Sequence, residues 1–193
     1  MKTLNQYIKE KLVINKDYRD TKIAEPKSFD ELRKIIEDRY DKLGAGTEHY
    51  PIDFNDIDVS NIDSFYSRNR DKGLFEGTKF KHIDISDWDV SNVTNMVAMF
   101  FRCEELKSVG DISEWDVSNV TDMGSMFFRC EKLESVGDIS NWNVSKVTNM
   151  SYMFAFCKKF NQDISNWDVS KVRYKIDMFG NCPIKNEYKP KFK

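Results

Sequence analysis

The sequence predicts an α/β fold, namely a solenoid of about five short strand-helix rungs behind an N-terminal helical cap. The main observation is a block reading D-I-S-x-W-(D/N)-V-S-x-V, which recurs at nearly equal intervals and begins at Asp84, Asp111, Asp138 and Asp163. The second observation is that each block continues into a spaced apolar pattern, V-x2-M-x2-M-F-x2-C. A unit of this length buries its apolar face only by stacking on its neighbours.

The N-terminal residues 1–50 lack the repeat and are predicted to form a helical cap. Leu4, Ile8 and Leu12 recur at every fourth position after Thr3, a residue type that favours the start of a helix. One short amphipathic helix is therefore expected near the start of the chain.

A second cap helix has clearer boundaries. Ser28 followed three residues later by Glu31 matches a capping box, and Gly44 is a helix stop signal. Apolar residues between them fall on one helical face, which is expected to cover the open end of the repeat core: Leu32, Ile35, Ile36, Tyr40 and Leu43.

The repeats occupy residues 51–182 and start with a divergent rung. The segment Phe54–Ile62 matches the later blocks, with Ile57 at the place where Trp88 stands in the next rung. An insertion follows it and predicts a loop or bulge near residues 68–72. After the repeats, residues 183–193 form a basic C-terminal tail.

Each regular rung is predicted to hold one strand, one corner, one helix and a return. In the second regular rung the strand is Asp111–Trp115, and the helix is Val120–Cys130, with apolar residues at i, i+3, i+6, i+7 and i+10. Asp116 and Ser118 lie in the corner, where side-chain oxygens accept from free backbone N–H groups. Three recurring residue types are expected to stack as buried ladders: Trp88, Trp115, Trp142 and Trp167; Phe100, Phe127, Phe154 and Phe179; Cys103, Cys130, Cys157 and Cys182.

Composition indicates a folded chain with an uneven charge. Hydrophobic residues make up 40% and aromatic residues 13%, which is too apolar for a disordered chain. The net charge is +1 over residues 1–50, −9 over 51–140 and +6 over 141–193. No signal peptide or membrane span is recognised, so the chain as written is expected to be cytoplasmic or virion-associated, or at the cell surface if a signal is supplied otherwise.

No catalytic, cofactor-binding or metal-binding residues are predicted. His49 and His82 are the only histidines, and neither has a Cys, Asp or Ser partner at a motif spacing. The four cysteines lack a C-x2-C spacing and are expected to be small buried thiols. The repeated aspartates are expected to cap corners rather than bind calcium, because Asn143 keeps the capping oxygen in one rung without the charge.

Residues that break the repeat indicate a contact surface. At about 100° per helical residue, Phe101 lies about 140° from Met96 and so points away from the core. Phe128 is its equivalent in the next rung, while Tyr152 and Phe156 occupy outward positions in the third. Adjoining exposed aromatic residues usually mark an interaction surface; packing on return loops of their own rungs and self-association are the open alternatives. The predicted partner-binding residues are Phe101, Phe128, Tyr152, Phe156, Glu104, Glu105 and Glu131.

The repeat resembles that of the BspA-like leucine-rich-repeat surface proteins, written D-I-S-x-W-D-V-S-x-V-T-x-M-x-x-M-F-x-x-C-x-x-F, over residues 53–182. The opening KTLNQYIKEKLVINKDY is also similar to the start of repeat proteins encoded by gut bacteria and their phages. The resemblance implies a curved leucine-rich-repeat-like solenoid that binds other proteins, commonly at the cell surface. It implies no chemistry.

The sequence therefore predicts a non-enzymatic protein-binding module, adhesin-like by the resemblance, with an unidentified protein as its partner and no cofactor. Nucleic acid is not the expected partner, because the basic residues gather in the last rung and the tail and the pI is about 5.8. The alternative is a self-assembling structural component of a virion or surface layer, in which the basic end of one copy meets the acidic face of the next.

Overall fold

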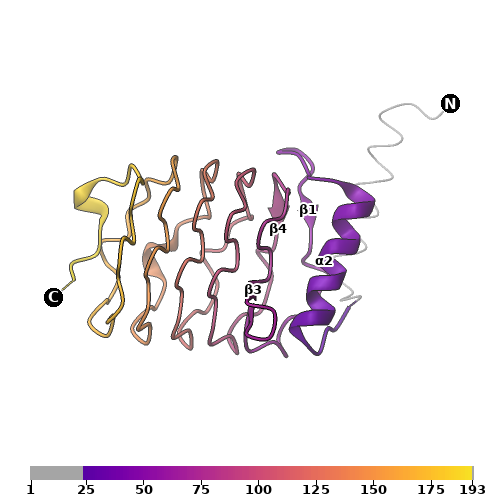
Figure 1. Ribbon diagram of the computed structural model, residues 1–193, viewed down its shortest axis with the longest axis horizontal. Helices are drawn as coiled ribbons and strands as arrows, with labels where there is room; N and C mark the ends of the chain where they lie inside the picture. Colours follow the sequence, from indigo (N-terminus) through magenta and orange to yellow (C-terminus); the bar gives the residue numbers. More distant parts are fainter. Residues whose placement is uncertain (1–23, 193) are drawn as a thin grey trace.

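The computed structural model describes residues 24–192 (Figure 1). The short helix predicted around Leu4, Ile8 and Leu12 lies outside these residues. None of the described helices has the length and apolar character that crossing a bilayer requires. The described elements are α2 (Phe29–Leu43), β1 (Ile52–Asp53), β2 (Tyr66–Ser67), β3 (Lys72–Gly73), β4 (Ile83–Asp84) and two 3-10 turns, η1 (Ile139–Asn141) and η2 (Asn186–Tyr188).

The predicted leucine-rich-repeat-like solenoid of strand-helix rungs is wrong. Within residues 24–192, α2 is the one α-helix, it precedes the repeats, and each strand is two residues long. The segments Asp111–Trp115 and Val120–Cys130, predicted as a strand and a helix, consist of turns and irregular backbone.

Hydrogen bonds between neighbouring repeats explain why no helix forms there. The N–H of Met123 donates to the carbonyl of Asn149 at 3.0 Å, and the N–H of Ser125 donates to that of Ser151 at 2.8 Å. A helix needs those N–H groups for carbonyls four residues earlier in the chain. Ser125 and Arg129 also have φ of 55° and 58°, a left-handed conformation that a right-handed helix excludes. The apolar spacing therefore reflects a run of tight turns.

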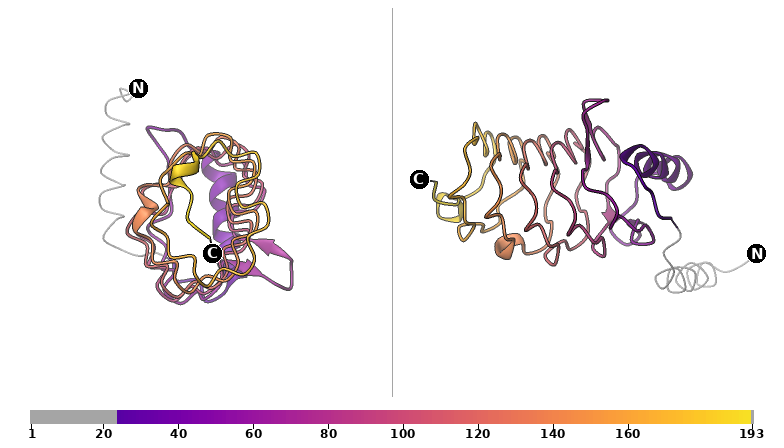
Figure 2. Two further views of the ribbon diagram at one scale, coloured as in Figure 1. Left: turned by 90° about the vertical axis from the view of Figure 1, so that its left-hand side faces the viewer. Right: turned by 90° about the horizontal axis from the view of Figure 1, so that it is seen from below.

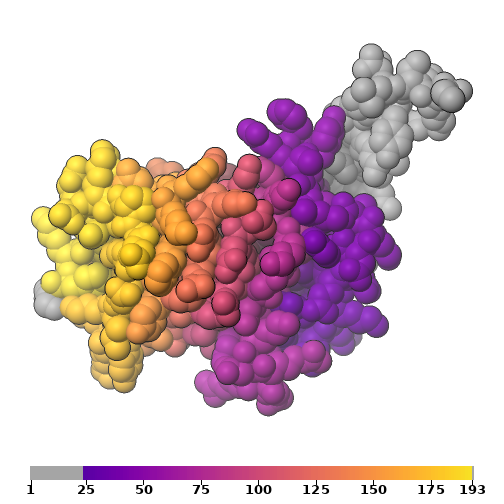
Figure 3. Space-filling model, turned by 45° about the horizontal axis from the view of Figure 1, so that its top comes forward, coloured from indigo at the N-terminus to yellow at the C-terminus, as the bar shows by residue number. Residues whose placement is uncertain are grey.

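Each repeat forms one circuit of the chain, called a coil below, and successive coils lie side by side along the long axis of the molecule (Figures 1 and 2). Figure 3 shows the surface that they form, with the N-terminal segments at one end and the last coil at the other. Parallel bridges join equivalent positions, from Ser64 to Asn95 to Asp122 to Asn149 to Tyr174. The coils are coil 1 (53–83), coil 2 (84–110), coil 3 (111–137), coil 4 (138–162) and coil 5 (163–182), and residues 183–192 are the tail.

The predicted tryptophan ladder forms part of the core and is confirmed as a stack for Trp115, Trp142 and Trp167, while Trp88 packs on Phe65 and Phe75. Trp88, Trp115, Trp142 and Trp167 are 3–4% exposed, and the centroids of the Trp115 and Trp142 rings lie 6.4 Å apart with parallel planes. Each indole N–H donates to a carbonyl of the preceding coil, as Trp115 does to Ile85 at 3.2 Å. Burying a ring of this size stabilises the fold by about 2–3 kcal/mol, and the satisfied N–H avoids the cost of an unpaired donor.

The phenylalanine and cysteine ladders lie beside it. Phe127 stacks between Phe100 at 5.2 Å and Phe154 at 5.5 Å, measured between ring centroids. Cys103, Cys130 and Cys157 are buried free thiols, as predicted, and Cys182 is half-buried. The sulfur of each contacts a carbonyl oxygen of the preceding coil, including that of Phe100 at 3.1 Å from Cys130 Sγ.

The predicted corner caps are also confirmed. Asp116 Oδ1 accepts from the N–H of Ser118 at 3.0 Å, and the same two-residue bond recurs in coil after coil. Asn143 caps Ser145 in this way at 3.2 Å without a charge. The Asp or Asn at this position of the block therefore satisfies a backbone N–H group in the corner of each coil.

At the N-terminal end, α2 packs against coil 1. Its boundaries are those predicted: the Ser28 hydroxyl accepts from the N–H of Glu31, and Gly44 ends the helix with φ of 77°. The carboxylate of Glu31 accepts from the N–H of Lys27 rather than from that of Ser28. Leu32 and Ile36 are fully buried against the core.

A hairpin occupies the predicted loop near residues 68–72. The antiparallel strands β2 and β3 pair Tyr66 with Gly73 and Ser67 with Lys72, and the hairpin projects from the side of the stack (Figure 2). Parallel pairing of β1 with β4 joins the chain after α2 to the start of coil 2.

Candidate interaction surface

The structure brings the four predicted aromatic residues together in one cluster, the aromatic strip (Phe101, Phe128, Tyr152 and Phe156). Phe101 and Phe128 stack with ring centroids 5.0 Å apart. Phe128 meets Tyr152 at 6.2 Å and Phe156 at 5.7 Å, both in edge-to-face geometry. Tyr152 is 39% exposed and the other three rings are partly exposed. The rings therefore contact neighbouring coils and remain open to solvent on one side.

Two residues of this strip have a left-handed backbone conformation and lie two positions before and two positions after Phe154 of the phenylalanine ladder. Tyr152 has φ of 58° and Phe156 has φ of 63°. The equivalent positions are left-handed in coils 2, 3 and 5 too, so the conformation belongs to the fold rather than to the strip: Ala98 and Arg102 in coil 2, Ser125 and Arg129 in coil 3, Asp177 and Asn181 in coil 5.

Arg129 also belongs to this surface, although the sequence reasoning did not select it. Its guanidinium lies 5.2 Å from the Phe156 ring centroid and 5.9 Å from that of Phe128. Cation-π contacts of this kind are worth about 0.5–1 kcal/mol at an exposed site. Arg129 occupies in coil 3 the position that Phe156 occupies in coil 4, and this equivalence in the repeat was the available signal.

Two of the three predicted acidic contact residues are held in ion pairs between coils. Glu105 pairs with Lys132 at 2.8 Å, and Glu131 pairs with Lys158 at 2.6 Å, each reaching from one coil to the next. The hydrogen bond from Lys132 lowers the pKa of Glu105 below its usual value. Glu104, the third, is partly exposed beside Glu105. The acidity expected beside the strip is therefore largely neutralised within the chain.

An open polar pocket of about 290 Å³ lies apart from the strip and is lined by residues of coils 1, 2 and 3, including His82. His82, Lys107 and Glu134 line it together with Glu48 and Asp84. Burial, and then the positive charge of Lys107, lower the pKa of His82 below 6.5. Sequence reasoning treated His82 as isolated because these residues share no motif. Lys107 and Glu134 occupy equivalent positions of neighbouring coils, and the equivalent of His82 itself is Ser108.

Neither metal ligands nor buried thiols point to a chemical site in the part of the chain that the structure describes. Across residues 24–192 no group of three or more His, Cys, Asp or Glu side chains is placed so that it could hold a metal ion. Burial raises the pKa of the Cys103 thiol to about 11, which disfavours its reactive thiolate form.

Comparison with known proteins identifies a family. The model of the family described as "Mycoplasma protein of unknown function, DUF285" matches residues 68–191. This family is only loosely related to the BspA-like repeats, so the match does not confirm that resemblance. No curated protein and no solved structure matches the chain.

Proposed function

The chain belongs to this DUF285 family, and we propose that it is a non-catalytic protein-binding module whose contact surface is the aromatic strip. The proposal is carried by one observation: two large aromatic side chains occupy left-handed backbone positions at the surface, where the fold does not need them.

The backbone conformation favours other residues at these two positions. A left-handed conformation costs an L-residue roughly 1–2 kcal/mol, and Asn and Asp adopt it more readily than bulky residues. Coil 5 has Asp177 and Asn181 there, in agreement with that preference. Coil 4 has Tyr152 and Phe156 instead, both outside the buried core. Contacts with Phe128 and Arg129 offset part of the backbone cost, and the solvent-facing sides of both rings are left for a partner.

The strip is also preorganised for binding. Phe128 touches three other rings, and Arg129 lies over Phe128 and Phe156, so few side-chain rotations remain to be lost on association. Clusters of aromatic residues and arginine supply most of the binding energy at many protein interfaces. Because Glu105 and Glu131 are paired with lysines, we assign the binding energy to the rings and only orientation to Glu104 and the ion pairs.

The experiment compares two strip variants with matched surface controls. Phe101→Ala with Phe128→Ala removes the stacked pair, and Tyr152→Asn with Phe156→Asn removes the other two rings while suiting the left-handed backbone. Tyr50→Ala and Leu43→Ala remove large exposed apolar side chains elsewhere, which are 55% and 54% exposed. Each protein is immobilised and the bacterial proteins that it retains are quantified by mass spectrometry; any candidate partner is then purified and its Kd is measured.

We expect a partner that wild type and the control variants bind alike and that both strip variants bind at least about tenfold more weakly. Thermal melts must show all variants folded. Equal affinity of folded strip variants for that partner contradicts the proposal. The self-assembly alternative predicts instead that light scattering detects an oligomer that dissociates at high salt and is unaffected by the strip variants.

A further inference from the structure

Backbone hydrogen bonds give the stack of coils a direction. On the face formed by residues 96–102 of coil 2 and their equivalents, each coil donates N–H groups to carbonyls of the next coil. Tyr152 donates to Ile176 at 2.8 Å and Phe154 donates to Met178 at 2.9 Å. The same direction holds from coil 1 to 2, 2 to 3 and 3 to 4. This face therefore has an acceptor edge on coil 1 and a donor edge on coil 5.

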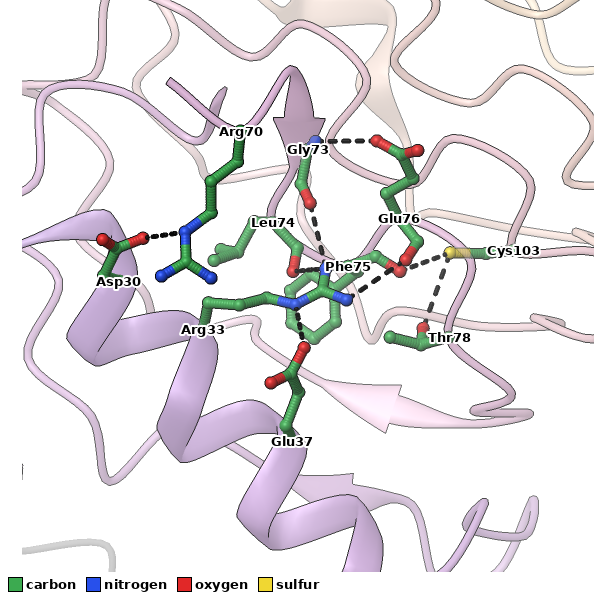
Figure 4. Close-up of polar contacts among 10 residues, drawn as sticks. All are labelled: Asp30, Arg33, Glu37, Arg70, Gly73, Leu74, Phe75, Glu76, Thr78 and Cys103. Carbon is green, nitrogen blue, oxygen red and sulfur yellow. Dashed lines mark hydrogen bonds and ion pairs between the residues drawn. The ribbon is translucent and has the colours of Figure 1, made fainter. Parts of the chain in front are cut away.

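The acceptor edge is closed by α2. Arg33, which is 6% exposed, donates through Nη1 to the carbonyls of Gly73 at 3.0 Å and Leu74 at 2.6 Å, and through Nη2 to that of Glu76 at 3.3 Å (Figure 4). The carbonyls of Leu74 and Glu76 in coil 1 are equivalent to those of Met126 and Phe128 in coil 3, which accept N–H groups from coil 2. The guanidinium thus replaces the donors of a preceding coil.

The donor edge has no such cover on its backbone. The N–H groups of Asp177, Phe179 and Asn181 are the equivalents of donors that reach forward in every earlier coil, and within residues 24–192 they meet no acceptor. The tail turns across the core, with Ile184 4% exposed and Ile164 donating to Tyr188 at 3.0 Å (Figure 2). Its contacts with the edge are made through side chains, with Lys175 over the Phe192 ring at 4.7 Å and Lys189 over the Phe179 ring at 5.7 Å.

The exposed side chains around this edge are mostly apolar or basic. Tyr174 is 61% exposed and Ile176 is 63% exposed. Lys171 and Arg173 are exposed just before them, and Asp177 is the one acidic residue between positions 171 and 181.

We infer that the donor edge of coil 5 binds an extended, acidic segment of another polypeptide. The backbone carbonyls of that segment accept from Asp177, Phe179 and Asn181, its apolar side chains contact Tyr174 and Ile176, and its carboxylates lie near Lys171 and Arg173. Addition of an extended segment to an open edge draws its affinity from main-chain hydrogen bonds and its specificity from the flanking side chains.

A second copy of the chain is a poorer occupant. Its own acceptor carbonyls are held by Arg33 and covered by α2. Two donor edges facing each other would oppose N–H to N–H and place Lys171 and Arg173 against the same residues of the other copy. The inference rests on other residues than the aromatic strip, although Tyr152 and Phe156 lie in coil 4, directly beside the coil that carries this edge.

The test uses two fluorescein-labelled ten-residue peptides, one alternating Glu with Val and one alternating Lys with Val. Binding to the whole protein is measured by fluorescence anisotropy, and amide hydrogen exchange is followed by NMR. We expect the Glu peptide to bind, the Lys peptide to bind at least about tenfold more weakly, and the amides of Asp177, Phe179 and Asn181 to become protected.

Matched variants locate the site. Lys171→Glu should weaken binding of the Glu peptide about fivefold, and adding Arg173→Glu should weaken its binding further. Lys146→Glu reverses the same charge at the equivalent position of coil 4 and should leave binding unchanged. Phe101→Ala with Phe128→Ala should also leave it unchanged, which separates this inference from the proposed function.

Three results would overturn the inference. The first is that the Glu peptide does not bind at 1 mM, a concentration about a thousandfold above a micromolar Kd. The second is that Lys171→Glu and Lys146→Glu weaken binding equally. The third is that the peptide binds but leaves the three amides unprotected. Protection of those amides that grows with protein concentration in the absence of peptide would instead assign the edge to a second copy.

Discussion

The two ends of the stack complete their backbone hydrogen bonds differently. At the N-terminal end a helix covers the core, and Arg33 supplies the donors that coil 1 lacks. At the C-terminal end the tail covers the core through Ile184, yet the donors of coil 5 stay open. The difference teaches that covering apolar surface and satisfying the backbone edge are separate tasks in a stack of coils.

The largest expected effect is the loss of the N-terminal cap. Arg33→Met should lower the free energy of unfolding by about 3 kcal/mol, because three carbonyls lose a charged donor and Glu37 loses its ion-pair partner. Urea denaturation measures this. Arg70→Met, which breaks an exposed pair with Asp30, should cost less than about 0.5 kcal/mol. Equal stability of the two variants would show that Arg33 does not act as the cap.

The second largest effect is a difference in thiol reactivity between Cys103 in coil 2 and Cys182 in coil 5. Burial raises the pKa of Cys103 to about 11, and Cys182, although its pKa is also raised by burial, is only half-buried. Because the thiolate is the reacting species, Cys182 should be alkylated at least about 100-fold faster in the native protein. Mass spectrometry of partly alkylated protein measures both rates. Similar rates would mean that coils 2 and 5 open equally often.

The tail should contribute a smaller, local stabilisation. Ile184→Ala removes a side chain that is 4% exposed at the end of the core and should cost about 2 kcal/mol. Amide exchange should accelerate in coil 5 and remain unchanged in coil 2. Uniform acceleration through all coils would indicate that the stack unfolds as one cooperative unit from this end.

The smallest effect is a pH dependence confined to the N-terminal half, where both histidines lie. Burial and Lys107 lower the folded-state pKa of His82 below the unfolded value of 6.5, so the unfolded chain binds more protons in that window. Stability is complete above pH 6.5 and is lost as the pH falls through the folded pKa. His82→Gln should flatten this dependence in urea titrations; an unchanged slope would exclude His82 as its source.

Local signals in the sequence predicted well where neighbours in the chain decide the structure. Ser28 and Gly44 set the ends of α2, because capping bonds reach only a few residues. The tryptophan ladder and the aspartate caps also followed from the repeat, since every coil needs them. The aromatic strip was identified because its residues interrupt that repeat.

The helix predicted in each repeat was wrong because spacing alone does not show where N–H groups donate. Met123 and Ser125 donate to coil 4 rather than within their own segment. Likewise, Arg33 and its acceptors lie far apart in the chain, and no local pattern joins them. The ion pairs of Glu105 and Glu131 could have been found from the recurrence of opposite charges at one coil period.

The sequence by itself determined the period, the residues of the core ladders, the corner caps and the ends of the cap helix, because each depends on residue type at a fixed short spacing. Only the tertiary structure decided that the repeats are turns without helices, that Arg33 closes one edge and that Asp177, Phe179 and Asn181 leave the other open. Those features depend on hydrogen bonds between coils, and the direction of such bonds is set when the coils stack.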